Sequence, residues 1–282
     1  MEKERWQLEP YRQWALAHGW DEVVYRLVNG RPLRLLALFP ETVQRDGPAP
    51  AVVFVHGGGW TGGSAQQYLP HCAYFAQRGA VGISIGYRLM DREHGIPLCA
   101  CMEDVAAAVA WLREHAVQLG VDSARMAAVG DSAGAHLLLS LLARDRAYWP
   151  NVLVNCNGVT DLTGTFLRFV PRLAGDTEAD VFKRAKELSP LSHIRPGLPP
   201  LLNLQGADDK TVLPEETYRF HAAYAACGND SQYIVWPDTR HAFLVPDYTA
   251  PDWQIIRALQ AIDGFFTKLG FLRAQSKEEG TP

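Results

Sequence analysis

Short runs of consecutive apolar residues alternate along this chain with longer segments in which apolar residues return every three or four positions. Runs of the first kind predict strands buried on both faces of a sheet, and segments of the second kind predict helices. The predicted strands are 52–55, 80–85, 126–129, 151–155, 201–205 and 232–236. The predicted helices lie near 66–78, 99–119, 135–143, 179–187, 214–227 and 252–268. This alternation favours the α/β class, a mostly parallel sheet with helices on both faces.

Two further strands precede the alternating pattern and are joined by a tight turn. Residues 22–28 and 33–38 are rich in Val and Leu, and Asn29-Gly30 lies between them. Asn-Gly is the strongest short-range signal for a hairpin turn, because both residues adopt positive φ at little cost. We therefore expect an antiparallel hairpin at the N-terminal edge of the sheet. The polar ends of the chain, 1–5 and 274–282, are expected to fray.

The length of the chain, 282 residues, is enough for one large α/β domain, and we predict a single domain over 1–282. Residues 158–197 contain no clear strand, but they carry several large apolar side chains and the charged helical stretch. We interpret this segment as a small cap-like excursion over the edge of the sheet where the parallel strands end. A plain surface connection is the alternative interpretation.

Charge and composition exclude several kinds of partner. The formal net charge is −4 with both signs mixed along the chain, so we expect no binding to nucleic acid or to a membrane surface. No apolar run approaches the roughly 18 residues that span a bilayer. The first residues lack the apolar core of a secretory signal, and an odd number of cysteines, five, fits a reducing compartment. A cytoplasmic location is therefore expected.

The motif Gly130-Asp131-Ser132-Ala133-Gly134 lies between a predicted strand and a helical segment. In a G-x-S-x-G pentapeptide at such a turn, the serine is pushed out of the sheet, where a substrate can reach it. Glycine is required at both ends because a side chain there would crowd the neighbouring strand or helix. The N-terminus of the following helix supplies free N–H groups and a positive dipole end, which suit a developing oxyanion.

A second glycine-rich turn, His56-Gly57-Gly58-Gly59-Trp60, follows the first strand of the alternating pattern. Three glycines after a strand let backbone N–H groups approach a ligand closely, as the second half of an oxyanion hole requires. A phosphate-binding loop is disfavoured, because neither G-x-G-x-x-G nor a Gly-Lys pair is present here.

A serine hydroxyl is a poor nucleophile unless a base accepts its proton and a third group orients that base. In this architecture an acid and then a histidine follow the serine along the chain. Asp208 and Asp209 come shortly after the strand 201–205, and His241 comes shortly after the strand 232–236. Because the carboxyl ends of parallel strands meet at one edge, these candidates are expected on the same edge as the serine.

Taken in this order, the motifs resemble those of α/β-hydrolases, in the esterase branch that carries an H-G-G-G-W oxyanion loop. The chain is similar to hormone-sensitive-lipase-like carboxylesterases and, more closely, to acetylxylan and feruloyl esterases. The resemblance implies an α/β-hydrolase fold with a mostly parallel sheet, an N-terminal antiparallel edge hairpin and helices on both faces. It rests on residues 56–60, 87–89, 103–105, 111–112, 130–136, 189–191, 206–214 and 241–243.

The resemblance implies that Ser132 is the nucleophile, that His241 is the general base and that Asp209 is the acid. Asp209 falls three residues after a glycine, as in the family's G-x-x-D pattern. The family usually has proline four residues after the acid, whereas Pro214 is five residues after Asp209. Asp208 as the acid would make that spacing worse, so Asp209 is favoured and Asp208 is the alternative.

The same resemblance implies a set of backbone donors and a set of substrate-binding residues. The implied oxyanion donors are the N–H groups of Gly58, Gly59 and Ala133. The candidate substrate-binding residues are Trp60, Tyr87 and Asp131. For the two aromatic residues, packing in the core is the alternative.

The predicted function is a serine carboxylesterase that hydrolyses short-chain, acetyl-type esters through an acyl-enzyme. Acetylated carbohydrate is one candidate substrate, so the expected partner is a small-molecule ester or an acylated oligosaccharide. No metal or organic cofactor is expected. An aryl-formamidase-like or peptidase-like amide hydrolase is the alternative on the same fold. A non-catalytic binding module is a more distant alternative, because all three triad candidates are present. The sequence does not specify the oligomeric state.

Overall fold

The computed structural model describes residues 7–41, 47–172 and 175–274, so the ends predicted to fray lie outside the described residues, apart from residue 274. Within the described residues the strands form one sheet in the order β1-β2-β4-β3-β5-β6-β7-β8. The strands are β1 Asp21–Val28, β2 Arg31–Leu38, β3 Ala49–Val55, β4 Val81–Ile85, β5 Val121–Asp131, β6 Val152–Cys156, β7 Leu201–Gly206 and β8 Ser231–Trp236. β2 runs antiparallel to β1 and β4, and the other neighbours are parallel. The predicted sheet with its N-terminal hairpin is confirmed.

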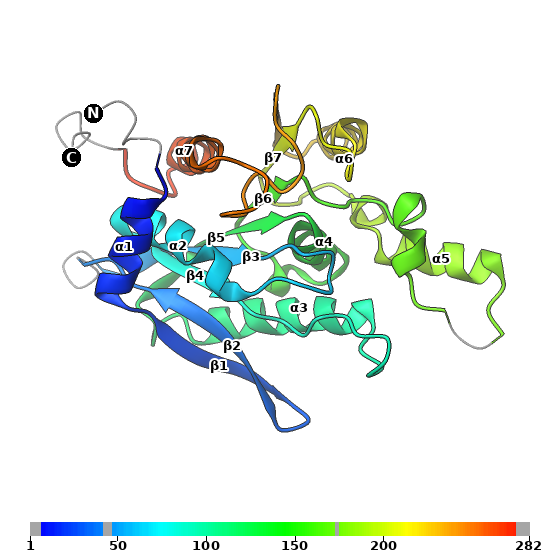
Figure 1. The fold of residues 1–282 in the computed structure, drawn as a ribbon, viewed down its shortest axis with the longest axis horizontal. Coiled ribbons are helices and arrows are strands. Elements are labelled where there is room, and N and C mark those ends of the chain that lie inside the picture. Colours follow the sequence, from blue (N-terminus) through cyan, green and yellow to red (C-terminus); the bar gives the residue numbers. More distant parts are fainter. Residues whose placement is uncertain (1–6, 42–46, 173–174, 275–282) are drawn as a thin grey trace.

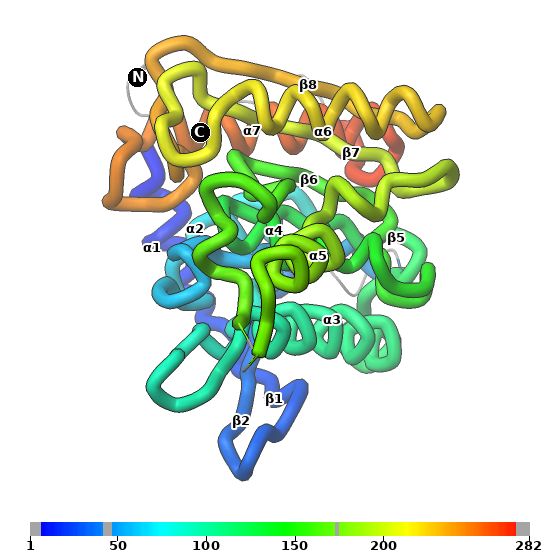
Figure 2. The backbone as a smooth tube through the Cα atoms, turned by 90° about the vertical axis from the view of Figure 1, so that its right-hand side faces the viewer, coloured from blue at the N-terminus to red at the C-terminus, as the bar shows by residue number. Residues whose placement is uncertain are grey.

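Helices cover both faces of this sheet (Figure 1, Figure 2). They are α1 Glu9–His18, α2 Leu69–Gln77, α3 Leu98–Glu114, α4 Ala133–Leu139, α5 Glu178–Leu188, α6 Pro214–Ala226 and α7 Asp252–Lys268. Residues of α3, α4 and α6 share one buried core with the sheet, and residues of α1, α2 and α7 share the other. None of these helices, within the part of the chain that the structure describes, has the length and apolar character needed to cross a bilayer.

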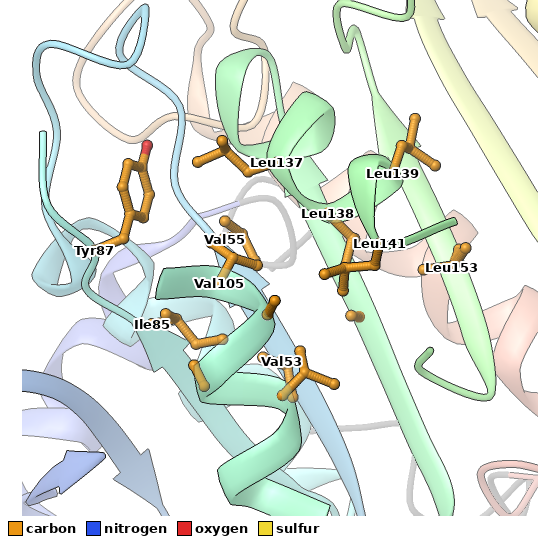
Figure 3. Close-up of a cluster of buried hydrophobic side chains, with 14 of the residues drawn as sticks. Val53, Val55, Ile85, Tyr87, Val105, Leu137, Leu138, Leu139, Leu141 and Leu153 are labelled. Carbon is orange, nitrogen blue, oxygen red and sulfur yellow. The ribbon is translucent and has the colours of Figure 1, made fainter. Parts of the chain in front are cut away.

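Strand β3 shows how one apolar run supplies both cores. Val53 and Val55 belong to the core under α3 and α4, whereas Val52 and Phe54 belong to the core under α2 and α7. Figure 3 shows part of the first core, between the sheet and helices α3 and α4. Successive side chains of a strand point to opposite faces of the sheet. A strand that is covered on both faces is therefore apolar at successive positions and does not alternate between apolar and polar residues.

The structure contains one helix that was not predicted, α1, and ends another, α3, earlier than predicted. The apolar pattern does not predict α1, because Ala15 is the buried residue among its ten. This helix is held by a neighbour instead, with the ring of Tyr11 centred 5.2 Å from that of Tyr74 in α2. Helix α3 ends at Glu114 rather than near residue 119, because the backbone leaves the helical conformation at His115, with φ −103° and ψ 14°. The chain then turns at Gly120, where φ is 63°, to enter β5.

The segment 158–197 contains a 3₁₀ turn at Thr165–Phe169 and helix α5, and its described residues include no strand. Thr177 begins α5 with a capping box: its hydroxyl accepts a hydrogen bond from the Asp180 N–H, and the Asp180 carboxylate accepts one from the Thr177 N–H. Figure 1 shows α5 at the opposite end of the molecule from α1.

A buried carboxylate fastens the N-terminal hairpin to the rest of the fold. Asp104 of α3 accepts two hydrogen bonds from the Arg88 guanidinium, at 2.7 and 2.9 Å, and one from the Arg88 backbone N–H, at 3.1 Å. It accepts another from Arg26 of β1, at 2.8 Å. Its side chain is fully buried, and two guanidinium groups compensate for the loss of hydration. Arg88 and Asp104, two of the residues that carry the family resemblance, therefore hold β1 and the chain after β4 against α3.

The surroundings of two helical glycines predict opposite effects of the same substitution. A Cβ on Gly134 of α4 would overlap the backbone carbonyl oxygens of Val55 and His56, whereas a Cβ on the exposed Gly264 of α7 would meet nothing within 4 Å. We expect Gly264→Ala to raise the free energy of unfolding by about 0.5–1 kcal/mol, because alanine is the better helix former. Gly134→Ala should lower it by about 3 kcal/mol or prevent folding. Urea unfolding measures both, and equal effects would contradict this packing.

Candidate active site

The backbone reverses at Ser132, between the end of β5 and the start of α4. Ser132 has φ 50° and ψ −118°, and its N–H donates a hydrogen bond to the Cys156 carbonyl of β6. A Cβ on Gly130 would overlap the backbone of Ala135, and a Cβ on Gly134 would overlap β3. The steric reason given above for the two glycines therefore holds. The turn presents the serine hydroxyl at the carboxyl edge of the sheet.

The side chains of Ser132, His241 and Asp209 are joined end to end. The Ser132 Oγ lies 2.8 Å from His241 Nε2, and His241 Nδ1 lies 2.7 Å from Asp209 Oδ2. The carboxylate keeps the proton on Nδ1, which leaves the Nε2 lone pair to accept the hydrogen bond of the serine hydroxyl. Asp209 is buried, whereas Asp208 is exposed. Of the two acid candidates, the structure therefore brings Asp209 to the histidine and leaves Asp208 in solvent.

Further donors hold the Asp209 carboxylate in place. Its Oδ1 accepts hydrogen bonds from the N–H groups of Thr211 and Val212, at 2.8 and 3.0 Å. Its Oδ2 accepts one from Gln205 Nε2 of β7, at 3.1 Å, in addition to the bond from His241. With these donors the carboxylate has no freedom to rotate away from the imidazole, and its buried charge is stabilised.

Backbone N–H groups from two turns are free to bind a ligand next to the serine. Gly58 and Gly59 have φ of 108° and 60°, conformations that a side chain would strain. Among the hydrogen bonds of the described residues, none uses the N–H of Gly58, Gly59 or Ala133. Ala133 is the first residue of α4, where an N–H has no partner within the helix. These three groups can therefore donate to an oxyanion.

A cavity of about 430 Å³ opens beside the serine. It is lined by the glycine loop, by Ser132 and His241, and by Phe166 and Phe169 from the segment 158–197. Of the three candidate substrate-binding residues, Trp60 and Asp131 border this cavity, although each is only 1% exposed.

The third candidate, Tyr87, is not among the residues that line the cavity. Its ring stacks on His56 with centroids 4.2 Å apart, and its hydroxyl donates to the His56 carbonyl at 2.8 Å. Tyr87 therefore packs behind the glycine loop and does not line the cavity, as the alternative interpretation of this residue predicts.

Two further histidines lie near the site but are occupied by structural hydrogen bonds. His136 Nε2 bonds to the Leu188 carbonyl at 3.0 Å, and its Nδ1 accepts from Trp60 Nε1 at 3.3 Å. His56 Nδ1 bonds to the Gly57 carbonyl at 2.9 Å. Burial lowers the pKa of both rings to about 4, so both are neutral at pH 7. They hold the glycine loop rather than the serine.

Two buried amides at the site, Gln205 and Asn157, were not predicted from the sequence. Gln205 contacts Asp209, and Asn157 contacts both Asp131 and the N–H of Ala242. Gln205 could have been noticed as a polar residue within an apolar strand. Asn157 follows a strand end, and nothing in its neighbourhood along the sequence indicates its contacts.

A family model described as BD-FAE matches residues 38–224. The chain belongs to this family. Esterase LipQ of Mycobacterium tuberculosis is 30% identical to it over 218 residues, which are 69% of this chain and 50% of LipQ. Carboxylesterase NlhH of the same species is 40% identical over 99 residues, 34% of this chain and 30% of NlhH. The BD-FAE chain thus spans about half the length of LipQ.

Solved structures resemble the BD-FAE chain over most of its length. Esterase 2 of Thermogutta terrifontis with bound propionate is 31% identical and has a TM-score of 0.79. The match covers 92% of this chain and 97% of that one. Together with the sequence relatives, it confirms the predicted α/β-hydrolase fold and the predicted resemblance to esterases. In the described part of this BD-FAE chain, no group of three or more His, Cys, Asp or Glu residues could hold a metal ion.

Asp131, which precedes the serine, is a buried carboxyl group with only one oxygen paired in this BD-FAE chain. Its Oδ1 accepts a hydrogen bond from Asn157 at 3.0 Å, whereas the buried Oδ2 accepts none of good geometry, although the buried Tyr68 hydroxyl interacts with the carboxyl group. Burial raises the pKa of Asp131 to about 6, against the opposing effects of His241 and of the bond from Asn157. Ionised Asp131 is therefore less stable in the folded protein than in the unfolded chain.

The difference between the folded and unfolded states predicts that Asp131→Asn gains stability relative to wild type, by an amount that depends on pH. Between the unfolded pKa near 3.9 and the folded pKa near 6, the folded state holds a proton that the unfolded state has lost. The stability contributed by this group is thus present below about pH 4 and lost as the pH rises through 6. Asparagine keeps the acceptor for Asn157 and removes the charge. We expect its advantage over wild type in urea unfolding to grow by about 3 kcal/mol from pH 4 to pH 7.5. A difference independent of pH would contradict the assignment.

Proposed function

We propose that this protein is a serine carboxylesterase that hydrolyses esters of short-chain, acetyl-type acids through an acyl-enzyme. The observation that carries the proposal is the unbroken chain of contacts from Asp209 through His241 to Ser132 on the wall of a cavity. A serine activated in this way attacks carbonyl carbon, and the relatives named esterases share the fold.

In the proposed reaction, the Ser132 oxygen attacks the ester carbonyl carbon while His241 Nε2 takes the hydroxyl proton. The buried Asp209 carboxylate stabilises the imidazolium that forms. His241 then gives its proton to the leaving alcohol. A water molecule attacks the acyl-enzyme by the same route, releasing the acid and the free serine.

The negative charge on the carbonyl oxygen would be met by three backbone donors, those of Gly58, Gly59 and Ala133. Their N–H groups have no other partner among the described residues, and glycines at 58 and 59 allow the close approach. Donors that are already oriented lose little free energy to reorganisation when the charge develops, which is why such groups lower the barrier.

A short acyl group is supported by the size and walls of the cavity. At about 430 Å³, with Val159 and Phe166 in its lining, the cavity lies toward the small end of ligand sites. Solved structures of Thermogutta esterase 2 with propionate and with butyrate add weight by analogy.

A carbohydrate alcohol is supported by a second cavity that shares a wall with the first. This space of about 710 Å³ is bordered by Arg168 and Phe169, which also border the serine cavity. Asp91 and Arg92 line it beside apolar residues, a combination that suits the hydroxyl groups and apolar faces of a sugar.

We propose that the segment 158–197 acts as a small cap within a single domain, because it supplies this shared wall. A cytoplasmic location completes the proposal.

The first test is a series of p-nitrophenyl esters of increasing acyl length, beside acetylated xylo-oligosaccharides and an N-formyl aryl amide. We expect kcat/KM to be highest for acetate to butyrate and to fall for longer chains that exceed the cavity. Folded Ser132→Ala should retain only the weak activity that binding and the oxyanion donors supply. Wild-type-like turnover by this variant would exclude the mechanism, and preference for the formyl amide would favour the amide hydrolase.

The second test separates the two neighbouring aspartates. Asp209→Asn should lower kcat by a factor on the order of 10⁴, because an amide cannot hold the imidazole in the required tautomer. Asp208→Asn is the matched control, since Asp208 is exposed, and its kcat should stay within about twofold of wild type. The reverse result would move the acid to Asp208.

A further inference from the structure

Asn157 occupies a point where three strand ends meet the loop that carries His241. It is the first residue after β6 and is fully buried, with φ of 41°. Its backbone N–H donates a hydrogen bond to the Leu204 carbonyl of β7, at 2.9 Å. The side chain is thereby fixed at the carboxyl edge of the sheet, between β5 and the histidine loop.

Both ends of the Asn157 amide are engaged by residues next to the triad. Nδ2 donates to Asp131 Oδ1, at 3.0 Å, and to the Cys156 carbonyl, which also accepts the Ser132 N–H. Oδ1 accepts the N–H of Ala242, at 2.9 Å. One side chain therefore bonds to the residue before the serine and to the residue after the histidine.

Only an amide of this length satisfies both contacts. The group that faces the Ala242 N–H must accept, and the group that faces the Asp131 carboxyl must donate. A carboxylate at 157 would repel Asp131, and an alanine would leave both partners unsatisfied in a buried place. Ser132 and Ala242 also have positive φ, 50° and 60°, so surrounding contacts must hold their backbones.

We propose that Asn157 is a positioning residue of the reaction, whose amide holds the histidine loop at the separation from Ser132 that proton transfer requires. The inference rests on the proposed function. The serine and the histidine are 109 residues apart in sequence and approach to 2.8 Å. The Asn157 side chain links the Asp131 carboxyl group, next to the serine, with the backbone N–H of Ala242, next to the histidine. A loss of about 1 Å in alignment is enough to lower a rate by about 100-fold.

Asn203 provides a matched control. It is also a fully buried asparagine, on the neighbouring strand β7, and its side chain bonds to Asn155, to Ser231 and to the Gln232 carbonyl. None of these partners lines the cavity or contacts the triad. Replacing Asn203 by alanine removes the same number of side-chain hydrogen bonds, one of them fully buried, and none that joins the serine to the histidine loop.

The experiment compares Asn157→Ala with Asn203→Ala on p-nitrophenyl acetate, and on paraoxon, which phosphorylates Thermogutta esterase 2. Folding is checked by circular dichroism, and rates are measured well below each unfolding midpoint. For Asn157→Ala we expect kcat and the rate of phosphorylation of Ser132 to fall about 10- to 100-fold, with KM changed less than about threefold. For Asn203→Ala we expect rates within about threefold of wild type.

An exchange of donor and acceptor supplies a second, independent readout. At a pH well above the Asp131 pKa of about 6, Asn157→Asp places an acceptor opposite the Asp131 carboxylate and the Cys156 carbonyl, and should slow the reaction toward the rate of Asn157→Ala. Adding Asp131→Asn restores a donor opposite an acceptor and keeps the acceptor for Ala242, while the bond to the Cys156 carbonyl stays lost. The double variant should therefore recover part of the rate, about threefold or more in kcat over Asn157→Asp. If Asn157→Ala does not fold, the comparison of Asn157→Asp with the double variant tests the proposal in its place.

The outcomes separate the two proposals. Equal losses in Asn157→Ala and Asn203→Ala, or no recovery in the double variant, would overturn the role of Asn157 while wild type remains an esterase. A wild-type protein that neither hydrolyses p-nitrophenyl esters nor reacts with paraoxon at Ser132 would overturn the proposed function, and this inference with it.

Discussion

The reversal of the backbone at Ser132 constrains the rest of the site. Because β5 gives way to α4 through a single residue with φ 50°, there is no space for a side chain on either flank of the turn. Gly130 therefore packs against the backbone of α4, and Gly134 packs against the backbone of β3. This close approach brings the glycine loop that follows β3 beside the serine. The positions of the serine hydroxyl and of the free N–H groups thus follow from one steric condition.

Buried polar groups hold this arrangement, and each is matched by a partner of the right kind. Asp209 accepts from two backbone N–H groups, from Gln205 and from His241, so its charge is tolerated without solvent. His136 donates to the Leu188 carbonyl and accepts from Trp60, and its burial keeps the ring neutral. Such networks fix side chains in one orientation, which is what a preorganised site requires.

Among the described residues that border the cavity, Asp131 is the exception, because its buried Oδ2 accepts no hydrogen bond of good geometry. Its surroundings favour the neutral acid, yet it lies next to Ser132 and on the edge of the cavity. Strained or unsatisfied groups persist where the many contacts around them hold them in place, and they cluster at functional sites. The stability lost at Asp131 is consistent with a position selected for the site rather than for the fold.

The sequence by itself determined the fold class, the hairpin at Asn29-Gly30 and the edge of the sheet at which Ser132 and His241 lie. These properties depend on local patterns: apolar periodicity reports which residues of an element are buried, and strand ends report the edge. The same patterns did not predict helix α1, because its position depends on its contact with α2 and not on an apolar stripe of its own.

The tertiary structure alone decided the contacts between loops that are distant in sequence. It brought Asp209 rather than Asp208 to the histidine, placed Tyr87 behind the glycine loop and set Asn157 between Asp131 and Ala242. Such contacts depend on how far each strand extends and on where its following residue points. A pattern that repeats every two or every 3.6 residues carries no information on that, because it describes each element separately.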